Sequence, residues 1–227
     1  MGRKPLIAGT LVTIFLLAGA PTGSSEDFGY VPLWPFASQQ EADRWLAQDA
    51  PRGVQAWHRD PAATAASFTR NYLGFSQIDR VIHVDDRDDE AWVDVGYTLP
   101  NGKDATAATI HLVRYGTDPA AAWEVVGSED TSLQLTSPAY GNSVGPVVTA
   151  GGEITGVDES VHIQVRQSTK VAVLGEYCCV QTGGDPGSWS AQVPVTGAAP
   201  GPLTMVAWTG GHVADVEKFA VTGLHAH

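Results

Sequence analysis

The second half of the chain is a series of short β-type runs separated by glycine- and proline-rich turns, and this pattern constrains the fold more than any other feature. In one run, Val161, Ile163 and Val165 alternate with polar residues, as in a strand with one buried face. About seven such runs with turn signals every 8–12 residues are typical of a two-sheet sandwich. We therefore expect residues 131–227 to form an all-β domain. Its predicted strands are 133–136, 147–157, 161–165, 170–177, 189–195, 203–208 and 219–221.

The same segment resembles a known family. Leu135-Thr136-Ser137-Pro138 opens it, Gly151-Gly152 lies within a strand, and Trp189 begins another strand before the late run Pro202–Trp208. This order of strands and turn residues is similar to the immunoglobulin-like domain of bacterial spore germination proteins, across residues 131–224. The resemblance implies a two-sheet sandwich on secreted or envelope proteins that serves as an accessory or binding module. It implies no set of functional residues, and it assigns no role in germination.

The first half of the chain begins with two helix signals. Ser38 and Glu41 have the S-x-x-E spacing of a capping box, in which each side chain bonds a backbone N–H of the first turn. Asp60 followed by Pro61 is typical of a second helix start, with an N-cap and a proline at the first helical position. We therefore expect two helices before the first strand.

Strand signals follow these helices. From Ile78 onward the apolar residues recur at every second position, and 100–102 is a strong turn signal. Residues 36–130 are therefore predicted to form an α+β domain of two helices and an antiparallel meander, followed by the immunoglobulin-like β-sandwich at 131–227. The predicted core of the α+β domain is Trp45, Phe68, Tyr72, Trp92, Val95, Ile110, Leu112, Trp123 and Val125.

Residues 1–25 have the layout of a secretory signal. A short basic start precedes an uncharged apolar run from Leu6 to Ala20, and small polar residues follow. The run is shorter than the ~20 residues that a membrane span needs. Cleavage after Ala20, cleavage nearer Ser24 and retention as an uncleaved anchor all stay open, and residues 26–35 form the expected linker.

Charge and the expected signal indicate a compartment and exclude some partners. The formal net charge is -12, whereas nucleic acid and anionic membrane surfaces attract basic patches. We therefore expect a secreted or cell-envelope protein with no nucleic-acid partner, and with membrane contact only through an uncleaved N-terminal segment. The expected partner is an unknown cell-surface protein or a glycan.

The two cysteines, Cys178 and Cys179, are neighbours and do not form the usual disulfide framework of a secreted domain. In a regular strand their side chains would point to opposite faces, which would leave one buried and the other partly exposed. A disulfide between the two neighbours is the alternative in an oxidising compartment. No other Cys or His lies close to them in sequence, so the sequence predicts no metal site there.

The sequence contains no strong catalytic or metal-binding motif, and no cofactor is expected. The acidic run Asp85–Glu90 lacks the spacing and central glycine of an EF-hand, so we interpret it as a solvated hairpin loop. None of the seven histidines has zinc-ligand spacing. A Ser–His–Asp triad assembles in space and is not visible in sequence, but no G-x-S-x-G elbow is present. We therefore predict that the protein is not an enzyme.

Two groups of residues are candidates for ligand contact. Trp57 and Trp208 are expected to be the most exposed tryptophans, and exposed aromatics can hold a glycan or a protein partner. In the α+β domain, which resembles small cystatin-like or NTF2-like units, Asp94, His111 and Tyr115 can line a pocket between helix and sheet, as ligand contacts or as an acid–base pair.

Three functions stay open at this point. They are binding or assembly at the cell surface, small-ligand binding in the pocket of the α+β domain, and a purely structural spacer. An open pocket with converging polar groups would favour the second function. A filled core with exposed aromatic side chains would favour the first.

Overall fold

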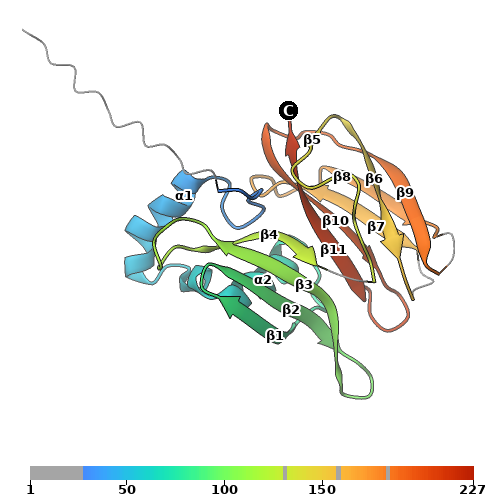
Figure 1. Ribbon diagram of the computed structural model, residues 1–227, viewed down its shortest axis with the longest axis horizontal. Coiled ribbons are helices and arrows are strands. Elements are labelled where there is room, and N and C mark those ends of the chain that lie inside the picture. The colour runs from blue at the N-terminus through green and yellow to red at the C-terminus, as the bar shows by residue number, and fades with distance from the viewer. Residues whose placement is uncertain (1–27, 130–131, 157–159, 183–184) are drawn as a thin grey trace, which may run out of the picture.

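The computed structural model describes residues 28–129, 132–156, 160–182 and 185–227 (Figure 1). The predicted signal segment 1–25 and the predicted boundary at Thr131 lie outside these ranges. Where it is described, the chain is mostly β, with two short α-helices and several antiparallel sheets. No helix in those ranges has the length and apolar character that crossing a bilayer requires.

Both predicted helices are present, and each begins at its predicted cap. The Ser38 hydroxyl accepts the Glu41 N–H at 3.3 Å, and the Glu41 carboxylate accepts the Ala37 N–H at 2.9 Å, one residue before the expected reciprocal bond. The Asp60 carboxylate accepts two N–H groups of the second helix's first turn. The helical segments are α1 (Gln39–Arg44), the π-helical η1 (Trp45–Asp49), the 3-10 turns η2 (Ala50–Arg52) and η3 (Ala56–Arg59), α2 (Pro61–Ser67) and the π-helical η4 (Phe68–Tyr72).

The predicted antiparallel meander is a four-stranded sheet with the order β1-β2-β3-β4. Its first hairpin differs from expectation, because β1 continues through Arg87 and the turn consists of Asp88 and Asp89. The interpretation of Asp85–Glu90 as a loop is therefore wrong for most of its length, since pairing with β2 extends to Arg87↔Glu90. The strands are β1 (Arg80–Arg87), β2 (Glu90–Thr98), β3 (Asp104–Arg114) and β4 (Trp123–Glu129).

The second half of the chain forms a five-stranded sheet, β5-β11-β10-β7-β8, and a two-stranded sheet, β6-β9. The predicted strand 170–177 is wrong in its first part, because Lys170 closes a turn onto Gln167 and β8 begins only at Gly175. The Val171 side chain there is fully exposed. The strands are β5 (Ser143–Val144), β6 (Val147–Ile154), β7 (Val161–Arg166), β8 (Gly175–Val180), β9 (Gly187–Pro194), β10 (Gly201–Thr209) and β11 (Lys218–Ala226).

Apolar side chains fill the space between the sheets. One core, which includes Ile163 and Trp189, lies between the five-stranded and two-stranded sheets. A second core contains Phe68 of the helical layer, Ile110 of the four-stranded sheet and Phe219 of β11. β11 packs against β4 and β3, and Figure 1 shows these elements side by side. The two halves of the chain therefore bury part of their apolar surface against each other, at ~1.5–3 kcal/mol for each large side chain fully removed from water.

Candidate functional site

The four-stranded sheet turns one face to α2, and its opposite face, the outer face, carries polar and aromatic side chains. Along β2, Ala91, Val93 and Val95 are buried in the core, whereas Trp92 and Asp94 are only partly buried. Side chains alternate between the two faces of a strand, so Trp92 and Asp94 share the outer face. The prediction of Trp92 as a core residue is therefore wrong.

A stack of side chains crosses the outer face. The Arg87 guanidinium lies 4.7 Å from the centre of the Trp92 ring. The His111 ring stacks on Trp92 at 4.7 Å with an interplanar angle of 7°, and Tyr30 meets His111 edge-on at 5.5 Å. Because the register places Trp92 directly opposite His111, strand pairing itself brings the two rings together.

Two glutamates hold this stack from its sides. Glu90 accepts the Tyr30 hydroxyl at 3.0 Å, and its other oxygen lies 3.1 Å from His111 Nε2. Glu129, the last residue of β4, accepts the Trp92 indole N–H at 2.9 Å. Side chains that are already held in place lose less freedom when a ligand arrives, so the stack is preorganised for binding.

Two aspartates add negative charge to the outer face. Asp94 accepts the Thr109 hydroxyl at 2.6 Å. Asp85 accepts Arg87 Nε–H at 3.0 Å, and this hydrogen bond lowers the pKa of Asp85 and raises the pKa of Arg87, so the pair stays charged at neutral pH. The carboxylates on this face outnumber the arginine; they are Asp85, Glu90, Asp94 and Glu129.

The outer face is hollowed on both sides of Glu129. One hollow of about 320 Å³ lies over Trp92, Asp94 and Glu129. A second hollow of about 350 Å³ extends from Glu129 past Tyr30 to Tyr140, in the second half of the chain. Glu129 lines both hollows, so a ligand that occupies both must pass this carboxylate.

The structure brings together two of the three predicted pocket residues, but on the outer face and not between helix and sheet. Asp94 and His111 lie there on neighbouring strands, and each bonds another partner, as described above. Tyr115 lies elsewhere, buried with Phe36 and Trp45 in a small cluster beside α1. Burial raises the pKa of Tyr115, so it stays protonated. The three residues therefore do not share one site.

Apolar side chains, including Phe68, Ile110 and Trp123, fill the space between α2 and the sheet, where the pocket was expected.

A buried acid, Glu124, also lies in the interior. One carboxylate oxygen accepts the Phe36 N–H at 3.2 Å, and within the described ranges the other oxygen has no hydrogen-bond partner. Burial raises the pKa of Glu124 well above its ordinary value, which favours the neutral acid.

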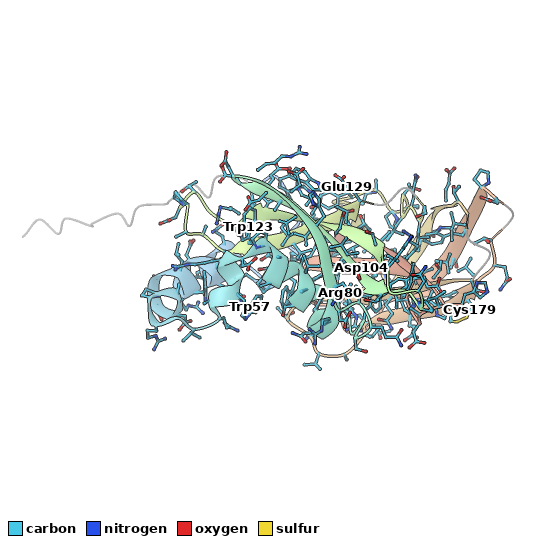
Figure 2. The ribbon with its side chains drawn as sticks, turned by 90° about the horizontal axis from the view of Figure 1, so that it is seen from below. Trp57, Arg80, Asp104, Trp123, Glu129 and Cys179 are labelled. Carbon is cyan, nitrogen blue, oxygen red and sulfur yellow. A yellow bond between two sulfur atoms is a disulfide. The ribbon has the colours of Figure 1, made fainter. Side chains whose placement is uncertain are left out.

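The two tryptophans predicted to be most exposed are both half-buried and lie apart. Trp57 stacks on Trp34 at 5.2 Å beside the helices. Trp208 stacks on His162 at 5.2 Å, and His162 in turn contacts Cys179. Figure 2 shows Trp57 and Cys179 well separated across the molecule. Trp57 and Trp208 therefore do not form one binding surface.

Cys178 and Cys179 are joined by a disulfide on β8, an edge strand of the five-stranded sheet. Both side chains are exposed, so the expectation of one buried cysteine is wrong. The β7–β8 register shifts at this point, and His162 of β7 lies opposite both cysteines. Its Nε2 is 3.7 Å from each sulfur. These three side chains place nitrogen and sulfur atoms close enough to share one metal ion.

Sequence reasoning missed several of these residues. Tyr30 lies in the predicted linker and Glu129 at the predicted domain boundary, and nothing local in the sequence marks either of them. Alternation along β2 places Trp92 and Asp94 on one face and Val95 on the other, which is inconsistent with a predicted core that contains both Trp92 and Val95. His162 could not be associated with the cysteines, because their contact depends on the pairing of β7 with β8.

Comparison with protein-family models finds no match, and comparison with curated proteins finds no relative of significant similarity. The resemblance to the immunoglobulin-like domain of germination proteins therefore rests on the order of strands and turn residues in 131–224.

Proposed function

We propose that this is a non-catalytic binding protein that acts outside the cytoplasm, secreted or at the cell envelope, in binding or assembly at the cell surface. Its binding surface is the outer face of the four-stranded sheet, and its ligand is a basic segment of a partner protein. The observation that carries this proposal is the preorganised stack of Arg87, Trp92 and His111 among four carboxylates.

Charge complementarity favours a cationic ligand. The outer face has more carboxylates than cationic side chains, and the whole chain has a formal net charge of -12. An exposed ion pair contributes only about 0.2–1 kcal/mol, so affinity must come from several contacts along one path. The long-range field would also increase the rate at which a basic partner arrives, and salt would weaken this effect.

A protein segment fits the outer face better than a sugar does. Sugar-binding aromatic rings need a free face, whereas Trp92 is already engaged by Arg87 and His111. Lysine and arginine side chains can bond the carboxylates and lay their aliphatic stems along the stack. The filled space between α2 and the sheet also favours surface binding over an enclosed pocket.

The remainder of the architecture is consistent with an accessory module. We propose that the second half is an immunoglobulin-like domain, and its two facing sheets around one core support this assignment. The layout of residues 1–25 supports export.

Binding of a synthetic peptide rich in lysine and arginine to the full chain tests the proposal. Calorimetric titration should show affinity that falls steeply as salt rises. Glu129→Gln and Asp94→Asn should each weaken binding about two- to fivefold, the loss expected from one exposed charge pair. Glu176→Gln is the matched control, because it removes one negative charge from the exposed side of β8 and should leave affinity unchanged.

Equal effects of Glu129→Gln and Glu176→Gln would show that only net charge matters, and would contradict a specific site. Binding of neutral oligosaccharides in place of the peptide, with loss in a Trp92→Ala variant, would replace the basic segment with a glycan. Absence of binding by both probes would remove the support for this function.

A further inference from the structure

The Cys178–Cys179 pair and His162 form a compact cluster because of a bulge between two strands. β7 and β8 pair at Val161↔Val180 and at Ile163↔Tyr177. Between these pairs β7 has one residue and β8 has two, so one histidine faces two cysteines. The bulge explains how neighbours in sequence can present both sulfur atoms to the same imidazole.

Aromatic packing holds the imidazole in position. The His162 ring stacks on Trp208 at 5.2 Å with an interplanar angle of 26°. Trp208 lies on the adjoining strand β10 and packs in turn against Phe75 at 5.4 Å. A ligand side chain that is oriented by its neighbours binds a metal with less ordering cost. Both cysteines are exposed on β8, so an ion can reach the cluster from solvent.

The two nitrogen–sulfur distances already match those of a three-coordinate metal centre. With a metal–sulfur bond of ~2.3 Å and a metal–nitrogen bond of ~2.0 Å at about 120°, nitrogen and sulfur lie about 3.7 Å apart. His162 Nε2 lies 3.7 Å from each of the two sulfur atoms. Only the separation of the two sulfur atoms must grow, and that follows when the bond between them is reduced.

We infer that Cys178, Cys179 and His162 form a redox-gated site for a soft monovalent ion of the Cu(I) class. Thiolates are soft ligands that select such ions, and imidazole completes a three-coordinate set without a fourth ligand. In the disulfide form each sulfur is bonded to its neighbour and carries no thiolate charge, so this form does not bind the ion. The site lies on a different sheet from the outer face, and the inference does not depend on the proposed function.

Reduction of the Cys178–Cys179 disulfide requires a two-electron reductant, and a dithiol is the class of compound that supplies both electrons by thiol–disulfide exchange. One thiolate of the dithiol attacks a sulfur of the protein disulfide and forms a mixed disulfide. Its second thiol then displaces that cysteine, which leaves two protein thiols and an oxidised dithiol. Binding of Cu(I) to both sulfurs releases the two thiol protons to solvent.

Competition for Cu(I) against a colorimetric chelator, without oxygen, tests the inference on the full chain. A phosphine reductant is used, since it is oxidised by the disulfide and water to a phosphine oxide and does not itself supply competing thiols. The reduced protein should take one Cu(I) per chain and show thiolate-to-copper charge-transfer absorption. The oxidised protein should take none. The double variant Cys178→Ser with Cys179→Ser should lose binding, and His162→Gln should weaken it about tenfold or more.

His83→Gln is the matched control, because this exposed histidine lies on β1, away from the cluster, and its loss should leave Cu(I) affinity unchanged. Circular dichroism of each variant separates loss of a ligand from loss of fold. Equal Cu(I) uptake by oxidised and reduced protein would overturn the redox gate. Unchanged affinity in a folded His162→Gln variant would overturn the three-ligand site, and uptake of Zn²⁺ without Cu(I) would overturn the choice of ion.

Discussion

His58 should make the fold sensitive to acid, and a single substitution should remove much of that sensitivity. Its side chain is 2% exposed. It is enclosed by the rings of Phe36, Trp45 and Trp57 at 4.8, 4.9 and 3.9 Å. In the described part of the chain neither ring nitrogen has a hydrogen-bond partner. Burial lowers the pKa of His58 to about 4, so the folded protein holds the neutral form.

The sign and size of the effect follow from proton linkage. An unfolded histidine takes up a proton near pH 6.5, whereas folded His58 does so near pH 4. Between these values the unfolded state binds more protons, so stability is present above pH 6.5 and is lost as pH falls toward 4. At 1.36 kcal/mol per pKa unit the full loss is about 3 kcal/mol, of which about 2 kcal/mol falls between pH 7 and pH 5.

Denaturant unfolding of the wild type and of His58→Phe at pH 7 and pH 5 measures this loss. Phenylalanine keeps a ring in the aromatic cage and removes the titrating group. Any packing cost of about 1–3 kcal/mol should be the same at both pH values. The variant should lose about 2 kcal/mol less than the wild type on acidification, equivalent to about 4–8 °C in Tm for a chain of this size. His83→Phe, at an exposed position, should leave the loss unchanged. If the wild type and His58→Phe lose the same stability on acidification, His58 is open to water in the folded state, and its burial does not account for the acid sensitivity.

Two further predictions concern a buried acid and a close approach of backbones. The raised pKa of Glu124 means that the folded protein keeps a proton above pH 4.5 that the unfolded chain releases, so stability falls as pH rises through this window. His58 contributes the opposite slope up to about pH 6.5 in every variant, so the test is a difference between variants. Unfolding titrations from pH 5 to pH 8 should show that the wild type and Glu176→Gln lose stability relative to Glu124→Gln as pH rises, and equal slopes in all three would contradict it. A Cβ at Gly152 would collide with the backbone carbonyl of Gln134, so Gly152→Ala should destabilise by about 1–3 kcal/mol or more. Gly145→Ala, where a Cβ has open space, should have little effect in the same thermal scan.

Local signals predicted the elements of this fold well. The caps at Ser38 and Asp60 begin the two helices, because each needs only the backbone of the following turn. Alternation in β7 predicted which residues are buried, because the pleat of a strand acts at every second position. In β2 the burial of Val95 was predicted correctly and that of Trp92 was not. The strand prediction failed for 133–136, where Leu133 forms an isolated bridge to Ile154 and not a continuous strand. It also failed for the first part of 170–177, where β-type residues are present but the chain turns at Lys170 and leaves Val171 exposed. Composition alone does not show whether a run finds a partner strand.

The candidate sites depend on contacts that the sequence does not contain. Asp94, His111 and Tyr115 were expected to line one pocket between helix and sheet. The structure places Asp94 and His111 on neighbouring strands of the outer face and Tyr115 in another cluster. Glu129 reaches Trp92 because β3 lies between β4 and β2 in the sheet.

The sequence by itself determined where the two helices begin, the antiparallel meander, the β-rich second half and the adjacency of Cys178 and Cys179. The tertiary structure decided which face of the four-stranded sheet is open, that the two halves share a core, and that His162 meets both cysteines at a bulge. The physical reason is the distance along the chain over which each kind of interaction acts. Caps, turns and alternation act within a few residues, whereas faces and cross-strand contacts depend on register and layer order, which are set by the burial of the whole chain.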